Sequence, residues 1–219
     1  MTKATKAASP DLSTRDKNKL DKRDRITRAA WERFSRDGFE ATTTAAVAEE
    51  AGVAKGTLFL YAADKDDLLM LVMHDRLAEA TDRAFATLPS RATLVEQCTH
   101  VFTALYELYA SQPRGLGLVF VRLVSTARGP NADRVHALTQ ALLSRLASLV
   151  RAAQERGEVA EDIPPLVAAS NLFAAYFMVL FGWLSGLAPT LDVLRAQVES
   201  MVALQFRGLA RGPHRPAKS

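Results

Sequence analysis

The chain has 219 residues, of which 48% are hydrophobic and 24% are charged, and its formal net charge is +4. These fractions lie near the globular average and exclude a wholly disordered or fibrous protein, while the small basic excess permits a nucleic-acid partner without establishing one. The single cysteine, Cys98, excludes an internal disulfide, and the four histidines are spaced too widely for a catalytic metal site. We therefore expect no metal and no cofactor.

The positions of proline and glycine predict an all-α protein. The stretches between these residues are too long for typical strands. Within them apolar residues recur at helical spacing, as from Leu94 to Leu108 and from Val135 to Ala153. The N-terminus lacks the apolar segment of a secretory signal, so we expect a cytoplasmic protein.

Composition predicts the domain boundaries. Residues 1–20 are polar with mixed charge, which predicts a disordered basic leader. Near residues 85–90, short charge-rich helices give way to longer helices rich in Ala, Leu and Val. We therefore place a first domain at 21–85, a second domain at 86–210 and a flexible tail at 211–219.

Three short helices are predicted within the first domain, at about 23–36, 44–50 and 54–61. Gly52 ends the second of these helices, so a short turn containing glycine joins the last two. This pattern is typical of a helix-turn-helix, here at about 43–62, whose second helix enters the DNA major groove. The first domain is therefore predicted to bind DNA.

One ordered series of motifs runs through this domain without a gap. Its members are Gly38-Phe39, Thr42-Thr43, Val47-Ala48, Ala51-Gly52-Val53, Gly56-Thr57-Leu58-Phe59, Tyr61 and Lys65-Asp66-Asp67-Leu68-Leu69. In these motifs the chain resembles the N-terminal DNA-binding domain of the TetR family of bacterial transcriptional regulators. It departs from the family pattern at Phe59, where members often have tyrosine, and at Ala62, where members have an aromatic residue.

The resemblance implies a set of DNA-binding residues in and beside the helix-turn-helix. They are Thr43, Thr44, Lys55, Gly56, Thr57, Tyr61 and Lys65. Their chemistry is compatible with that role, because hydroxyl groups, ammonium groups and free helix N-terminal amides all bind phosphate. Taken singly, Thr43, Thr57 and Lys65 are better explained as ordinary helix caps and a surface charge. The complete ordered set favours DNA binding.

The segment 166–188 is apolar on all sides and long enough to span a bilayer. The alternative function is therefore that of a membrane-associated or structural helical protein that uses 166–188 as an anchor. We favour a helix buried in protein, with no membrane partner, because Ser170, Asn171 and Ser185 interrupt the run and its flanks are acidic.

A helix that is apolar on all sides needs a packing partner on each side. We expect one stripe to face the core of its own domain and the other, together with the last helix, to face a second subunit. The dimer-interface candidates are Leu172, Tyr176, Trp183, Leu194, Val198 and Met201. The resemblance implies the same arrangement, because TetR-like proteins pair their last two helices with those of a second subunit. A twofold homodimer also predicts a palindromic operator.

The resemblance further implies a small-molecule effector in the second domain. The ligand-binding candidates are Phe102, Tyr106, Phe120, Arg122, Phe173 and Phe177. For each aromatic residue taken alone, plain core packing is the favoured interpretation. Large aromatic side chains suit a flat or hydrophobic ligand. Arg122 interrupts an apolar run, and it could pair with an anionic group or reach solvent.

Catalytic motifs are missing from the sequence, which has no glycine-rich phosphate loop, no G-x-S-x-G, no H-E-x-x-H and no clustered carboxylates. We therefore expect that the chain is not an enzyme. The sequence predicts an all-α, homodimeric, ligand-responsive DNA-binding regulator. More specifically, we expect a repressor that a small hydrophobic or aromatic effector releases from a palindromic operator.

Overall fold

The computed structural model describes residues 13–187 and 190–209, and within these ranges every regular element is an α-helix. The prediction of an all-α fold is therefore confirmed. The helices are α1 (Thr14–Asp37), α2 (Thr44–Glu50), α3 (Lys55–Leu58), α4 (Lys65–Ala86), α5 (Leu94–Ala110), α6 (Arg114–Val124), α7 (Pro130–Glu155), α8 (Pro165–Leu184) and α9 (Leu191–Leu209).

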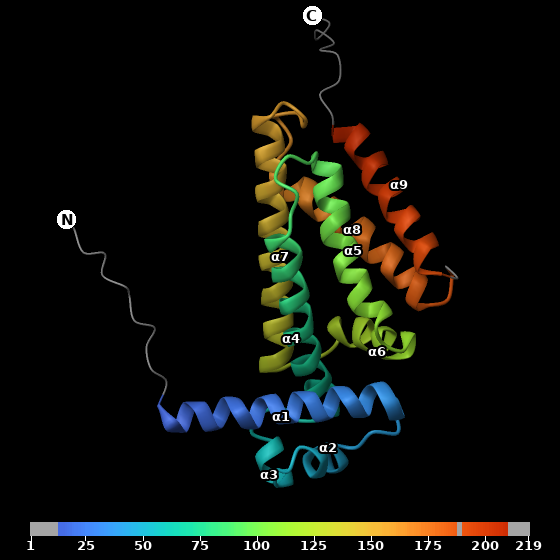
Figure 1. The fold of residues 1–219 in the computed structure, drawn as a ribbon. Helices are drawn as coiled ribbons and strands as arrows, with labels where there is room; N and C mark the ends of the chain where they lie inside the picture. The colour runs from blue at the N-terminus through green and yellow to red at the C-terminus, as the bar shows by residue number, and fades with distance from the viewer. Residues whose placement is uncertain (1–12, 188–189, 210–219) are drawn as a thin grey trace, which may run out of the picture.

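The helices form a small head and a larger body (Figure 1). In the head, which we define as α1, α2 and α3, α1 lies across the lower end of the molecule with the two shorter helices beneath it. The body comprises α5 to α9, and α4 rises from the head into it. Because α4 packs against α1 at one end and against α5 and α7 along its length, it connects the two parts.

Helix α1 begins earlier than the sequence predicts. The Ser13 side chain accepts a hydrogen bond from the backbone N–H of Asp16 at 3.2 Å, which makes Ser13 the N-cap. An acidic residue in the first turn stabilises the positive end of the helix dipole. Residues 14–20 are therefore helical although their side chains are exposed, contrary to their placement in the leader. The rest of that predicted leader, residues 1–12, and the predicted tail lie outside the described residues.

Side-chain caps fix the start of other helices as well. Thr43 caps α2 and Asp64 caps α4, each by accepting a hydrogen bond from a first-turn amide. At the start of α5, Thr93 and Glu96 form a reciprocal capping box. These short-range contacts fix where α2, α4 and α5 begin.

The core runs without interruption from the head into the body. In the head it is built on fully buried Ile26 and Phe34 of α1 and Leu58 of α3. In the body it includes Phe102 and Tyr106 of α5, which pack against α8. Helix α8 meets the length and composition of a membrane-spanning helix, but it packs against α5, α6, α7 and α9. One face of α8 remains exposed.

Candidate DNA-binding head and ligand cavity

The turn between α2 and α3 is built by glycine and small apolar residues. Gly52 has a φ of +62°, a left-handed conformation that side chains with a Cβ adopt only with strain. The Val53 amide donates to the carbonyl oxygen of Ala48 at 2.9 Å, which closes the end of α2. Buried Val47 and Ala48 let the two helices approach closely. The result is a helix-turn-helix.

The start of α3 presents an open surface. Lys55 and Gly56 are exposed, and a Cβ added at Gly56 would meet no atom within 4 Å. Phe59 and Leu60 follow on the same short segment and are also exposed, Leu60 by 82%. Neither was predicted as a site residue, although two apolar side chains directly after a buried leucine are a signal that the sequence contains.

Two of the predicted DNA-binding side chains, those of Thr43 and Tyr61, also have structural contacts within the head. The Thr43 hydroxyl caps α2 by accepting from the Ala46 amide at 3.1 Å. The Tyr61 hydroxyl donates to the carbonyl oxygen of Lys19 in α1 at 3.1 Å. Thr57 is half-buried and Thr44 is partly exposed, both within the helix-turn-helix.

Among the predicted DNA-binding residues, Lys65 has the most extensive contacts inside the protein, although its predicted role is to bind phosphate. Its ammonium donates to the carbonyl oxygens of Phe39 at 3.0 Å and Glu40 at 3.2 Å, and it lies 4.5 Å from the centre of the Phe39 ring. An ammonium group has three N–H donors, so these contacts leave at most one for an external group. Lys65 therefore ties the α1–α2 loop to the start of α4.

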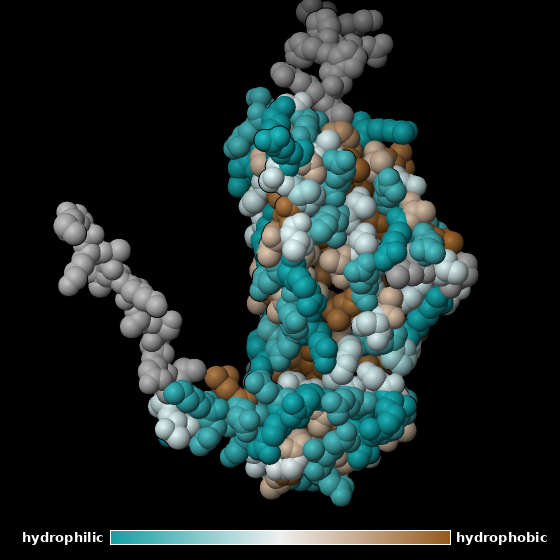
Figure 2. Space-filling view, viewed as in Figure 1, coloured by the Kyte–Doolittle hydropathy of each residue, from teal (hydrophilic) through white to brown (hydrophobic). Residues whose placement is uncertain are grey.

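Basic residues gather on the N-terminal half of α1. This part of the helix extends beyond α2 and α3 (Figure 1), and Arg15, Lys19 and Lys22 are exposed on it. On the visible face of the head, hydrophilic side chains predominate (Figure 2). A surface of this kind suits non-specific contact with phosphate groups.

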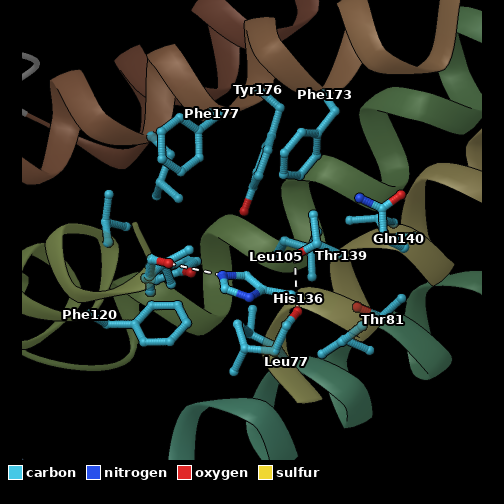
Figure 3. A pocket seen from close by; sticks show the side chains of 17 residues that line it. Leu77, Thr81, Leu105, Phe120, His136, Thr139, Gln140, Phe173, Tyr176 and Phe177 are labelled. Carbon is cyan, nitrogen blue, oxygen red and sulfur yellow. Dashed lines mark hydrogen bonds between the residues drawn. The ribbon is translucent and has the colours of Figure 1, made fainter. Parts of the chain in front are cut away.

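The body contains a cavity of about 360 Å³ between α4, α5, α6, α7 and α8 (Figure 3). Its lining residues are Leu77, Thr81, Leu105, Tyr109, Phe120, Val121, Val124, Val135, His136, Leu138, Thr139, Gln140, Leu142, Phe173, Tyr176, Phe177 and Leu180. No lining residue is an aspartate, glutamate, lysine or arginine. The volume lies within the range of about 300–1,000 Å³ that is typical of small-molecule sites.

The predicted ligand-binding residues divide into two groups. Phe120, Phe173 and Phe177 line the cavity (Figure 3). Phe102 and Tyr106 belong instead to the packed core behind it, because they are fully buried. Arg122, the last of the set, is exposed on α6 and does not line the cavity.

Tyr176 joins the cavity to that core. Its ring stacks on Phe102 with 4.9 Å between centroids, and its backbone carbonyl accepts a hydrogen bond from the Tyr106 hydroxyl at 2.7 Å. Its own hydroxyl points into the cavity (Figure 3). Burial raises the pKa of both Tyr106 and Tyr176 above the ordinary value for a phenol, so both remain neutral at physiological pH.

Helix α7 supplies much of the polar wall of the cavity. His136 Nε2 lies 3.0 Å from the carbonyl oxygen of Val124 in α6, and the Thr139 hydroxyl donates to Val135 one turn earlier. His136 and Gln140 are exposed, so the cavity meets solvent on this side. Such a site can hold a ligand that is mostly apolar and has a few polar atoms. The sequence analysis did not predict His136 and Thr139 as cavity residues.

Most of the predicted dimer-interface side chains pack inside one protomer. Leu172, Tyr176 and Trp183 are buried within one protomer. The same is true of Leu194 and Val198 on α9, while Met201 is half-buried. The physical reason is that α9 packs against both α5 and α8 and covers this side of α8. The five buried side chains therefore offer little surface outside the protomer, whereas Met201 also lines a groove on the outside of α8 and α9.

Helices α8 and α9 expose a different apolar face. Met178 is 62% exposed, and Phe181 on α8 and Leu204 on α9 are exposed as well. A groove of about 680 Å³ lies on this outward face. Its lining residues are Met178, Val179, Gly182, Leu187, Val193, Ala196, Gln197, Ser200 and Met201.

Comparison with known proteins yields similarity over the head and over the whole fold. Residues 26–71 match the family model described as "Bacterial regulatory proteins, tetR family". The fatty acid metabolism regulator protein of Bacillus subtilis is 22% identical over 167 residues, which are 76% of this chain and 86% of that protein.

Two solved structures share the architecture. Thermus thermophilus FadR, a TetR-family transcriptional repressor in complex with lauroyl-CoA, has a TM-score of 0.70 and 26% identity, covering 90% of this chain and 99% of that one. Bacillus subtilis FadR in complex with stearoyl-CoA has a TM-score of 0.68 and 21% identity, covering 84% and 98%.

Proposed function

This chain belongs to the TetR family of bacterial transcriptional regulators, and from that premise we propose that it is a homodimeric repressor released from a palindromic operator by a long-chain acyl effector. TetR-family proteins are regulators and not enzymes, which confirms the expectation drawn from the missing catalytic motifs. We assign DNA binding to 21–85, and effector binding and dimerisation to 86–210. Activity on DNA would place the protein in the cytoplasm.

For DNA recognition we propose that α3 enters the major groove. Exposed Lys55 and the bare backbone at Gly56 support close approach to base edges. Exposed Phe59 and Leu60 offer apolar contacts of the kind that thymine methyl groups accept. The amides at the start of α2, beside Thr43, would bind a phosphate group.

The observation that carries the effector proposal is the apolar cavity, which has an uncharged lining and a polar edge on α7. Apolar lining contacts favour a hydrocarbon chain, because each buried methylene contributes about 0.8 kcal/mol. The two FadR structures hold acyl-CoA molecules. We infer that the acyl chain of such a molecule occupies this cavity, with its polar end at the side marked by His136 and Gln140.

The effector proposal is tested by DNA release. An operator selected from random-sequence duplexes would be titrated with the protein, with and without lauroyl-CoA, and free CoA would serve as the control. We expect lauroyl-CoA, but not CoA, to weaken operator binding. Thr139→Phe should abolish the response without weakening DNA binding, because the half-buried Thr139 side chain has room to extend into the cavity. Equal responses to lauroyl-CoA and CoA would contradict the proposal.

For the dimer we propose the outward face of α8 and α9, which carries Met178, Phe181 and Leu204. These side chains are exposed in one protomer, so Met178→Glu with Leu204→Glu should leave the fold of the protomer intact. In a twofold interface the new carboxylates would lose their hydration, and we expect dimerisation to weaken by at least about 100-fold. Sedimentation measures the mass, and Ala137→Glu, on exposed α7, is the control. An unchanged dimer would place the interface elsewhere.

The alternative function, a membrane anchor formed by α8, rests on its length and hydropathy. Its contacts with four other helices instead favour a place inside a protein assembly. Expression without detergent separates the two functions: we expect the full-length chain in the supernatant with the mass of a dimer. Recovery only with membranes would favour the anchor.

A further inference from the structure

A buried side chain of the body contacts the turn that follows the recognition helix α3. Asn131 lies in the first turn of α7 and is almost fully buried. Its Nδ2 donates to the carbonyl oxygen of Tyr61 at 2.9 Å and to Oδ2 of Asp67 at 3.0 Å. A side-chain amide nitrogen has two N–H donors, so both are used in these contacts. Asn131 thereby joins α7 to the segment that follows α3.

Asp67 extends this contact to α4. Its Oδ2 also accepts from the Ala63 amide at 2.9 Å, and its own amide donates to the Asp64 cap at 2.8 Å. The Asp67 side chain is buried among these groups. The Asn131–Asp67 pair therefore holds together three segments: the turn that follows α3, the start of α4 and the start of α7.

The same helix that carries Asn131 forms a wall of the proposed effector cavity. Val135, four residues further along α7, is the first of its residues to line that cavity, followed by His136 and Thr139. Four residues of α-helix span only about 6 Å along the axis. Because an α-helix is stiff over this distance, a displacement of the cavity wall also displaces Asn131.

We propose that Asn131 is the positioning residue through which occupancy of the cavity controls the orientation of the recognition helix. With both hydrogen bonds formed, the backbone at Tyr61 is held against α7 and the head is fixed for DNA binding. A ligand that pushes α7 outward breaks the contact with Tyr61 and frees the head. Such a ligand acts only through its different affinity for the two arrangements. This inference rests on the proposed function.

A second set of contacts connects α7 to α1 through α4, and it is less suited to this role. Arg134 of α7 lies 3.3 Å from His74 and 3.8 Å from Asp75 on α4, and Asp75 pairs with Arg23 of α1. These groups are partly exposed, and partly exposed ion pairs are weak and screened by salt. They reach α1, whereas Asn131 contacts the segment that continues α3.

The central experiment compares Asn131→Ala with Asp133→Ala, an exposed control in the same turn of α7. Operator affinity would be measured with and without lauroyl-CoA, and lauroyl-CoA affinity would be measured separately by calorimetry. In the wild type and the control we expect the ligand to weaken operator binding by about 5–150-fold, the usual range of coupling between sites. In Asn131→Ala we expect less than about threefold, with unchanged lauroyl-CoA affinity. An Asn131→Ala protein that retains wild-type coupling would overturn the inference.

A double variant separates coupling from stability. Asn131→Asp alone places two carboxylates together in a buried site and should destabilise the protein. Adding Asp67→Asn restores an amide–carboxylate pair and should recover stability. It cannot restore the donor to the Tyr61 carbonyl, since a carboxylate only accepts hydrogen bonds. We therefore expect a folded but uncoupled protein, and full recovery of coupling would contradict the route through Tyr61.

Failure of the effector proposal can be distinguished from failure of the inference about Asn131. If the wild type binds the operator but ignores lauroyl-CoA, the effector proposal fails while the coupling can still be measured with DNA alone. Linkage requires that operator binding also affects α7. We then expect the operator to slow amide hydrogen exchange at 131–142 in the wild type and in Asp133→Ala, but not in Asn131→Ala. An equal change in all three proteins would overturn the inference.

Discussion

The head and the body differ in the features that determine their local structure. In the head, the Thr43 side chain caps the short helix α2, and Gly52, with its positive φ, makes the turn to α3. In the body, α8 is apolar on several faces and contributes to the wall of a cavity. The role of a cap or turn residue in the head follows from its close neighbours in the sequence, whereas an apolar residue on α8 can face the core, the cavity or the outer surface.

Tyr176 illustrates this difference within the body. Its ring packs in the core and its hydroxyl points into the cavity, although its helical position is equally compatible with a subunit interface. In the head, by contrast, Gly52 is suited to its place by its backbone conformation alone. The experiments below test whether the head and the body differ in stability and in DNA binding, or whether they unfold as one unit.

The largest effect is expected from removing one buried aromatic ring in each region. The ring centroids of Phe34 and Phe39 in the head lie 5.3 Å apart. Phe34 is fully buried, and we choose the fully buried Phe102 as its counterpart in the body. Phe34→Ala and Phe102→Ala should each cost about 3–5 kcal/mol of unfolding free energy, because each leaves a cavity. Urea unfolding would be followed at Trp31 of α1 and Trp183 of α8 in single-tryptophan variants.

If the two regions differ as proposed, Phe34→Ala lowers the Trp31 midpoint more than the Trp183 midpoint, and it abolishes DNA binding. Phe102→Ala should have the opposite preference. Coincident shifts of both tryptophan signals in both variants would mean that the continuous core makes head and body one cooperative unit.

A smaller effect is expected from Lys65→Ala, which tests whether a predicted DNA contact is structural. Lys65 donates to two loop carbonyls and is 26% exposed, so its loss should cost about 1–2 kcal/mol. The salt dependence of operator binding should be unchanged. Lys55→Ala is the matched control, since Lys55 is exposed: we expect little change in stability but a salt slope reduced by about one. A reduced slope for Lys65→Ala would restore its role as a phosphate contact.

The smallest effect is expected on stability at low pH, from the ion pair between Asp75 of α4 and Arg23 of α1. Burial alone would raise the pKa of Asp75, but hydrogen bonds with His74 and Arg23 outweigh it and hold that pKa below its ordinary value. A carboxylate with a lowered folded-state pKa stabilises the protein above its unfolded pKa, about 3.9, and loses this contribution as the pH falls through the folded pKa. Asp75→Asn should therefore flatten the decline of the melting temperature below about pH 4. Parallel curves for both proteins would exclude this contribution.

Much of the head was predictable because its signals are local. Gly52 marks the turn, and the cap at Thr43 and the small residues Val47 and Ala48 mark α2. Each of these depends on neighbours within a few residues. The side-chain partners of Tyr61 and Lys65 were not predictable, since Lys19 and Phe39 are brought to them only by the packing of α1.

In the body, the periodic pattern predicted the helices but not which face each would bury. Helix α8 is apolar on several sides, so the sequence could not distinguish the face that α9 covers from the outward face at Met178. For the same reason Phe102 and Phe173 were assigned one role, although only Phe173 lines the cavity.

The sequence by itself therefore determined the all-α fold, the helix-turn-helix and membership of a family, because helical period, caps and turn residues act over short distances. Only the tertiary structure decided which apolar stripe is buried, where the cavity lies and that Asn131 meets Tyr61 and Asp67. The hydrophobic effect is non-directional, so it stabilises the packing of helices without specifying which of their apolar faces are in contact. That choice depends on how all the helices fill space together.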